Sequence, residues 1–67
     1  MLNEKEGHVW QNAYDTAYAE SFTMHYTRLY SEGEEEAEAR SIARENAKQE
    51  AKDIADAVLS EYRKGRD

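Results

Sequence analysis

Residues 10–30 read WQNAYDTAYAESFTMHYTRLY, with an aromatic ring at every fourth position. Side chains four residues apart are stacked neighbours on the surface of an α-helix. The spacing therefore predicts one long helix with a continuous row of rings along it. We call this row the ring ladder, and its members are Trp10, Tyr14, Tyr18, Phe22, Tyr26 and Tyr30.

A row of alanines repeats the same spacing in the second half of the chain. It predicts a second helix with a groove of methyl groups along one side. The alanines are Ala39, Ala43, Ala47, Ala51 and Ala55.

The breaks in the sequence place the ends of the two helices. Proline is absent, and Gly33 in the stretch SEGE is the one glycine near the middle. Asn3 followed by Glu6 resembles a capping box, which puts a helix start near Glu4. We therefore expect a single domain over residues 1–67, with helices at about 4–31 and 34–63 joined by a turn at about 32–33. A short turn forces the helices antiparallel, so the predicted fold is an all-α helical hairpin.

Folding the chain about Gly33 predicts which residues meet. Rings would lie opposite alanines, since large side chains facing small ones fill a core without voids. The expected pairs are Tyr26 with Ala39, Phe22 with Ala43, Tyr18 with Ala47, Tyr14 with Ala51, and Trp10 with Ile54 and Ala55. The expected inward positions are Tyr14, Tyr18, Phe22, His25 and Leu29 on the first helix and Ala43, Ala47, Ala51, Ile54, Val58 and Tyr62 on the second.

Two helices alone make a small core. A row of every fourth residue drifts by about 40° per step, so six rings wind roughly 200° around their helix and cannot all face one partner helix. Small domains bury a low fraction of their surface, and this chain has no cysteine to form a disulfide. We therefore expect a homodimer that forms a four-helix bundle, with a foreign protein as the other way to cover the rings.

Charge and hydropathy narrow the classes of partner. Fifteen acidic and nine basic residues give a formal net charge of −6. An acidic chain disfavours nonspecific binding to nucleic acid and to anionic membranes. No apolar run approaches the ~20 residues that a membrane span needs, and the N-terminal stretch is polar and acidic. We expect a soluble, cytoplasmic protein with no membrane partner.

Residue types that often act as metal ligands or catalytic groups are present, but they do not stand at the spacings that such sites need. His8 follows Glu4 by four residues, but no third ligand is in register with this pair. His25 follows Glu20 by five residues, which does not align them, and no Glu-x-x-His motif occurs. No serine or threonine lies in a nucleophile elbow or beside a glycine-rich loop. We expect a noncatalytic protein with no metal and no cofactor.

The two ends of the ring ladder and a cluster of acids are the expected partner-binding site. Tyr and Trp are enriched where protein interfaces gain most of their energy. The pattern predicts a protein–protein interaction module, an adaptor or small inhibitor, whose rings enter an apolar pocket while its carboxylates steer toward a basic rim. The expected site residues are Trp10, Tyr30, Glu34, Glu35, Glu36 and Glu38.

The alternative is a nucleic-acid-related regulator. A basic row accompanies the alanine row on the second helix, although carboxylates flank it and can neutralise it. A dimeric RNA binder would use this row, whereas an acidic decoy would occupy the nucleic-acid groove of a defence or regulatory protein. A third possibility is a purely structural subunit of a larger assembly. The basic row consists of Arg40, Arg44, Lys48 and Lys52.

Overall fold

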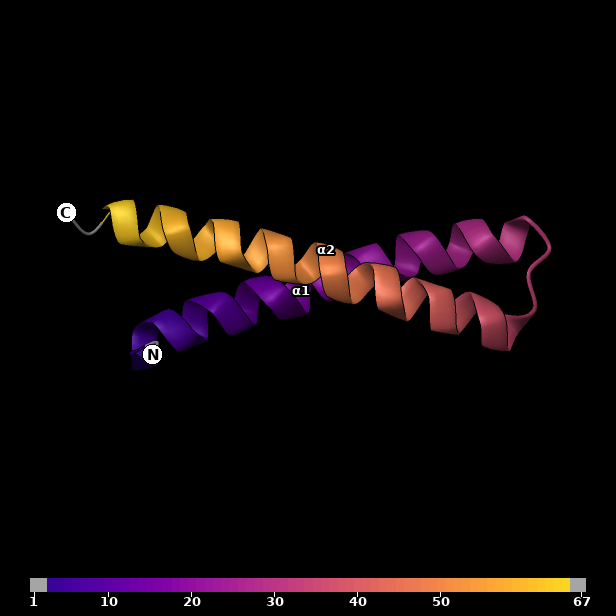
Figure 1. Cartoon of the computed structure of the whole chain (residues 1–67), viewed down its shortest axis with the longest axis horizontal. Helices are drawn as coiled ribbons and strands as arrows, with labels where there is room; N and C mark the ends of the chain where they lie inside the picture. The colour runs from indigo at the N-terminus through magenta and orange to yellow at the C-terminus, as the bar shows by residue number, and fades with distance from the viewer. Residues whose placement is uncertain (1–2, 66–67) are drawn as a thin grey trace.

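The chain folds as an antiparallel hairpin of two long helices. The computed structural model describes residues 3–65, in which α1 spans Glu4–Ser31 and α2 spans Glu36–Gly65. The turn lies at one end of the molecule, and α1 begins at the other end, where α2 finishes (Figure 1). The Cα atoms extend over 49 × 17 × 13 Å. This confirms the predicted all-α hairpin, and none of the helices among the described residues is long and apolar enough to cross a membrane.

The start of α1 is fixed by the capping box that the sequence predicts. The Asn3 side chain accepts a hydrogen bond from the backbone N–H of Glu6, with N and Oδ1 2.8 Å apart. In return, the Glu6 carboxylate accepts from the backbone N–H of Asn3 at 3.3 Å. Two backbone donors that a helix start leaves unpaired are thereby satisfied.

The end of α1 uses more residues than the sequence predicts. Gly33 has a φ of 99°, the left-handed conformation that glycine adopts without strain. Its N–H donates to the carbonyl of Tyr30, and the N–H of Glu34 donates to the carbonyl of Leu29, both at 3.1 Å. This pair of bonds is a Schellman motif, in which the residue after the glycine still closes the preceding helix.

The Schellman motif explains why α2 begins later than predicted. The N–H of Glu34 donates to a carbonyl of α1, so this residue still belongs to the end of that helix. The first hydrogen bond of α2 therefore runs from the N–H of Ala39 to the carbonyl of Glu35. The predicted start near residue 34 is therefore wrong by two residues, and the connection covers residues 32–35. The helix also continues to Gly65, two residues past the predicted end.

The predicted alanine row is the centre of the core. All five alanines have no exposed surface, and the row continues in the same steps of four to Leu59, which is 6% exposed. The expected shift to Ile54 and Val58 is wrong, because these side chains are 48% and 40% exposed. Rows with a spacing of four interdigitate when two helices cross at an angle, and α1 and α2 cross near their midpoints in Figure 1.

The row of α1 that faces the alanines is not the ring ladder. Ala17, Ser21 and His25 are the buried residues of this helix, and Val9 and Leu29 of the same row are half-buried. The ladder lies one row to the side, so its rings flank the alanine groove and do not fill it. The predicted placement of rings directly on alanines is wrong in this respect, since small side chains from both helices meet at the seam.

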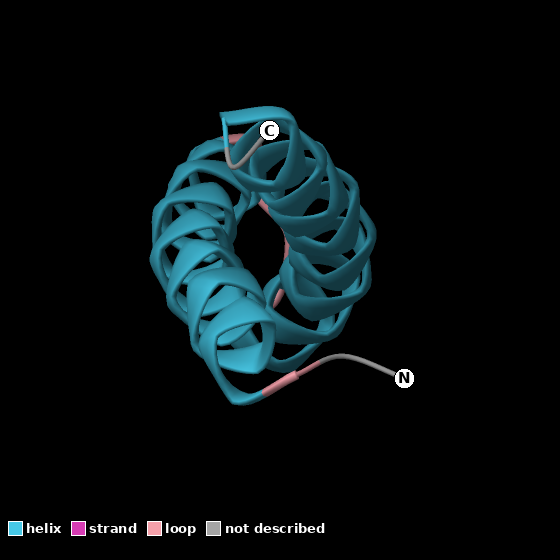
Figure 2. Cartoon of the chain, turned by 90° about the vertical axis from the view of Figure 1, so that its left-hand side faces the viewer, coloured by secondary structure: helices cyan, strands magenta, loops and turns pink. Residues whose placement is uncertain are grey.

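Crossing of the helices also changes the exposure of the rings. From Trp10 to Tyr26 each ring is half-buried, and Tyr30 is the ladder member classed as exposed, at 58%. In the view along the molecule, the helices lie on either side of a common axis and follow each other around it (Figure 2). The expectation that the six rings cannot all be covered by one partner helix agrees with the exposure of Tyr30, whereas the first five rings are half-buried.

Candidate functional site

The ring ladder is a stack of aromatic side chains. Successive ring centroids lie 5.0, 6.0, 6.0, 5.9 and 5.9 Å apart from Trp10 to Tyr30, with interplanar angles of 12–23°. The spacing equals the ~6 Å rise of four helical residues, so the helix itself sets the stack. Each inner ring of the ladder is therefore stacked between the ring before it and the ring after it. For Tyr30, the last member, one face has no ring beyond it in the stack.

Trp10 is held against α2. Its indole N–H donates to Asp56 with Nε1 and Oδ1 2.8 Å apart, and the other carboxylate oxygen accepts from Lys52 at 3.1 Å. The hydrogen bond from Trp10, followed by that from Lys52, lowers the pKa of Asp56. This contact lies one or two residues along α2 from the predicted neighbours, Ile54 and Ala55. Trp10 therefore helps to hold the two helices together.

The structure brings the basic row of α2 beside the ring ladder. Trp10 and Tyr14 line a shallow hollow together with Lys48 and Lys52. Because both rows repeat every four residues, the same register places Arg44 and Arg40 along the middle of the ladder, near Tyr18 and Phe22. We call this side of the hairpin the ring face. The sequence predicts the two rows separately and gives no sign that they adjoin.

Carboxylates on α2 neutralise most of the basic row. Arg40 pairs with Glu36 at 3.0 Å, Lys48 with Glu45 at 3.9 Å, and Lys52 with Asp56 at 3.1 Å. Among the residues that the structure describes, Arg44 is the member of the row with no ion pair. Exposed pairs of this kind contribute little to stability, so the row remains available to an anion that competes with its own carboxylates.

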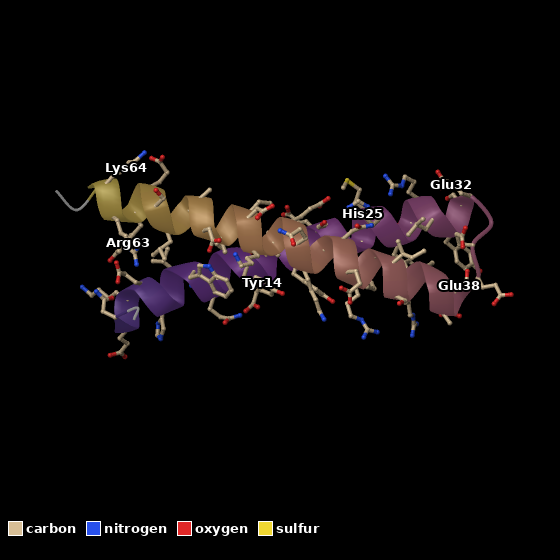
Figure 3. The ribbon with its side chains drawn as sticks, in the orientation of Figure 1. Tyr14, His25, Glu32, Glu38, Arg63 and Lys64 are labelled. Atoms are coloured by element: carbon tan, nitrogen blue, oxygen red, sulfur yellow. The ribbon has the colours of Figure 1, made fainter. Side chains whose placement is uncertain are left out.

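The acidic cluster and the last ring meet at the turn. Glu34 and Glu35 lie in the connection, Glu36 is the first residue of α2, and all three carboxylates are exposed. Glu38 belongs to the first turn of α2, and Figure 3 shows it with Glu32 at the turn end of the hairpin. The ladder ends there at Tyr30, immediately before Ser31 and the turn.

The predicted partner-binding residues do not form one patch. Trp10 lies twenty residues before Tyr30 on α1, which separates the two by about 30 Å along the helix. One part of the expected site is thus the turn end, with Tyr30 and the four glutamates. The other part is Trp10, near the open end of the hairpin.

A partly buried polar cluster lies in the seam, where it confirms the expected inward position of His25 and adds partners that the sequence does not predict. His25 is 7% exposed and lies where the two helices meet (Figure 3). Its Nε2 is 2.8 Å from Oε1 of Glu50, and its Nδ1 is 3.1 Å from a guanidinium nitrogen of Arg28. Ser21 donates its hydroxyl to the other Glu50 oxygen. The available signal was that Ser21 and His25 stand four apart in a row otherwise made of apolar residues.

The polar cluster fixes a proton position and does not form a catalytic triad. A guanidinium only donates, so Nδ1 of His25 accepts from Arg28 and Nε2 carries the proton that goes to Glu50. The serine hydroxyl donates to the carboxylate, whereas a nucleophilic serine donates to the histidine. Hydrogen bonds from Ser21 and His25, in that order, lower the pKa of Glu50 against the opposing effect of its partial desolvation.

The face opposite the rings carries the exposed aliphatic side chains. Val9, Ala13 and Ala17 of α1 line a groove with Ile54 and Val58 of α2, and Asn12, Thr16 and Glu20 form its edge. A second hollow continues it toward the turn and shares Ala17, Glu20 and Ile54 with the first. The exposed members of this aliphatic face are Met24 at 59%, Ile42 at 41%, Ile54 at 48% and Val58 at 40%.

The titratable residues give no grouping typical of a metal site. Within residues 3–65, no three His, Cys, Asp or Glu side chains come together in a way that could hold an ion. His8 is exposed near the start of α1.

Comparison of the chain with protein-family models, curated proteins and solved structures found no match. Its function is therefore inferred from its own surfaces, namely the ring face, the turn end and the aliphatic face.

Proposed function

We propose that this chain is a noncatalytic protein–protein interaction module, an adaptor or small inhibitor, that binds its partner with the turn end of the hairpin. The observation that supports this is the position of Tyr30. Its ring is 58% exposed, it ends a stack of half-buried rings, and it adjoins a cluster of glutamates. A large exposed ring on a rigid support is the kind of residue that contributes most to interface energy.

The two parts of the turn end have different roles in this proposal. The Tyr30 ring enters an apolar pocket of the partner and is held in position by stacking on Tyr26, with ring centroids 5.9 Å apart. The carboxylates of Glu34, Glu35 and Glu38 create a negative field that speeds the approach of a basic surface. Glu36 is partly neutralised by Arg40, so it contributes less to this field.

The test is a comparison of matched variants as bait in extracts of the cells that make the protein. Tyr30→Ala should reduce recovery of a specific partner by about tenfold or more, as expected for an interface residue of high energy. Thr27→Ala, exposed on the same helix, should keep it. Equal recovery with both variants, or equal loss with both, would contradict binding through the turn end.

Binding kinetics with the recovered partner separate the two roles. The double variant Glu34→Lys and Glu35→Lys should slow association more than it speeds dissociation, because steering acts on the approach of the two molecules. Asp53→Lys changes the charge of an exposed site on α2 away from the turn and is the control. If dissociation alone changed in the double variant, steering by the glutamates would be wrong.

The ring face supports a second candidate, the dimeric RNA binder. The supporting observation is that Lys48 and Lys52 lie beside Trp10 and Tyr14, because single-stranded nucleic acids are bound by basic grooves that also carry aromatic side chains. A fluorescent single-stranded RNA should then bind more weakly as salt increases, and Arg44→Gln should flatten this dependence. RNA binding that is absent at low salt would reject this candidate and leave the protein-binding module.

A further inference from the structure

We propose that the aliphatic face is the surface on which a second copy of this chain packs, giving a four-helix bundle whose ring faces point outward. This surface is distinct from the turn end, so the inference goes beyond the proposed function. It rests on which apolar side chains the hairpin leaves exposed and on the total area of its exposed surface.

The core of one hairpin is made of small side chains. Five alanines have no exposed surface, and Leu59 is the largest apolar residue in the buried set of residues 3–65. Four of the larger aliphatic residues lie on one side of the seam instead, and each of these four is at least 40% exposed. Helices that present an apolar side are stable when a second layer covers it. The uncovered residues are Met24, Ile42, Ile54 and Val58.

The hairpin exposes more surface than is usual for its mass, by an amount that one interface with a second copy would remove. The chain exposes 4951 Å² for a mass of 7.8 kDa. Monomeric proteins of this mass expose about 4,400 Å² by the usual relation of surface to mass, so this hairpin exposes roughly 550 Å² more. Specific complexes bury about 800 Å² on each partner. One interface of ordinary size would therefore remove the excess.

The shape of the face also favours an identical partner. Ile42, Ile54 and Val58 belong to one row of α2 with a spacing of four, in which Asn46 and Glu50 lie between Ile42 and Ile54. On α1, the half-buried Val9 and Ala13 line the groove at the edge of the seam, and their row becomes buried at Ala17. A second copy presents rows with the same ~6 Å rise per four residues, so ridges and grooves match along the whole face. Two copies related by a twofold axis would each bury the same patch, which closes the assembly at two.

The polar residues around the groove fit the rim of such an interface. Asn12, Thr16 and Glu20 lie along its α1 edge. Glu50, next to Ile54 in the second hollow, already accepts hydrogen bonds from Ser21 and His25. Burying this carboxylate further would therefore not leave it without partners.

The test is molar mass by sedimentation equilibrium from about 1 µM to 1 mM, a range that covers weak and strong homodimers. The wild-type chain should reach twice its monomer mass, and its melting temperature should rise with concentration, as mass action requires. A wild-type chain that stays monomeric at the highest concentration would overturn the proposal. If such a monomer bound a hydrophobic dye, the face would belong to a foreign partner.

A pair of glutamate substitutions on α2 locates the interface. Ile54→Glu puts a charge in the middle of the face and should raise the dimer dissociation constant by about 100-fold or more, since each dimer contains the change twice. Ser60→Glu adds the same charge at an exposed position about 120° around the helix from Ile54 and should leave the dimer intact. A dimer that survives Ile54→Glu would overturn the assignment of this face.

Two measurements keep this test decisive. Circular dichroism establishes that Ile54→Glu remains helical, which is expected because Ile54 is 48% exposed in the hairpin. If helicity is lost, Val58→Ser gives a milder change on the same row and should still weaken the dimer. Tyr30→Ala should leave the dimer unchanged, so failure of the turn-end proposal and failure of this one give different results.

Discussion

At the residue scale, the hydrogen bonds of His25 depend on which of its two ring nitrogens carries the hydrogen. Arg28 donates to Nδ1, so the neutral ring must carry its hydrogen on Nε2 in order to donate to Glu50. Long-range ¹H–¹⁵N spectra of the imidazole distinguish the two tautomers and should show that the neutral ring carries its hydrogen on Nε2. Arg28→Gln provides the comparison, because a glutamine amide can also accept and would relax this preference. A wild-type ring with its hydrogen on Nδ1 would contradict the arrangement.

Glu50 should make the stability of the hairpin dependent on acid. Its native pKa lies below the ordinary value of 4.5, so the native state binds this proton less readily than the unfolded chain does. The stabilisation is therefore present above pH 4.5 and is lost as the pH falls through the native pKa. Glu50→Gln should lower the free energy of unfolding at pH 7, and the gap from wild type should narrow toward acidic pH.

Urea titrations at several pH values measure this effect. Asp53→Asn, which removes an exposed carboxylate on the same helix, is the matched control and should shift the curve little. Asp56 also has a lowered pKa, so part of the acid dependence will remain in the Glu50→Gln variant. A gap from wild type that is constant with pH would show that the loss is not tied to the carboxylate.

At the scale of the elements, the seam between α1 and α2 is sensitive to side-chain size. Ala47 has no exposed surface and lies in the middle of the buried row. Ala47→Leu should therefore destabilise the hairpin by about 1–3 kcal/mol through overpacking. Ala57→Leu makes the same change at an exposed position of α2 and should have little effect. Chemical denaturation gives both values, and a neutral Ala47→Leu would mean that the seam is looser than the structure shows.

Two glycines should respond in opposite directions to the same substitution. Gly33 has a φ of 99°, so Gly33→Ala strains the Schellman motif and should cost about 1 kcal/mol. Gly7 lies within α1, where an added Cβ would meet no atom within 4 Å. Gly7→Ala should stabilise by about 0.5–1 kcal/mol, because alanine loses less backbone entropy in a helix. Thermal unfolding measures both, and changes of equal sign would contradict the backbone assignments.

The sequence predicts the helices well because their ends have local causes. The capping box at Asn3 and the glycine at position 33 act within a few residues. The choice of the row that faces the partner helix is not local, since neighbouring rows on α1 share one spacing. The size of the rings favours the ladder as the row that faces α2. Close approach of the two helices instead favours the small residues in the row beside it. For the same reason the Glu50 cluster could not be predicted, because its partners come from different helices.

At the scale of the whole molecule, the two helices are joined to each other at both ends of the hairpin. The turn joins the helices at one end, and a carboxylate joins them at the other. Glu6 accepts from the backbone of Asn3 through Oε1 and from Arg63 through Oε2, the latter at 2.7 Å. In Figure 3, Arg63 lies on the side of α2 that faces α1. One residue thus caps the start of α1 and holds the last turns of α2 against it.

Loss of the Glu6–Arg63 contact should open one end of the molecule and leave the middle unchanged. Arg63→Gln should speed amide exchange in the first two turns of α1 and the last two turns of α2, because these turns have no covalent connection to hold them together. Exchange near Ala47 should not change, and the global loss of stability should stay within about 1 kcal/mol, because the Arg63 side chain is half-exposed although that of Glu6 is largely covered. Lys64→Gln is the control, since Lys64 pairs with Glu61 within α2 at 3.6 Å. Equal fraying in both variants would mean that the ends are held by helix propensity alone, and fraying in Arg63→Gln alone would show that Glu6 joins the two helices.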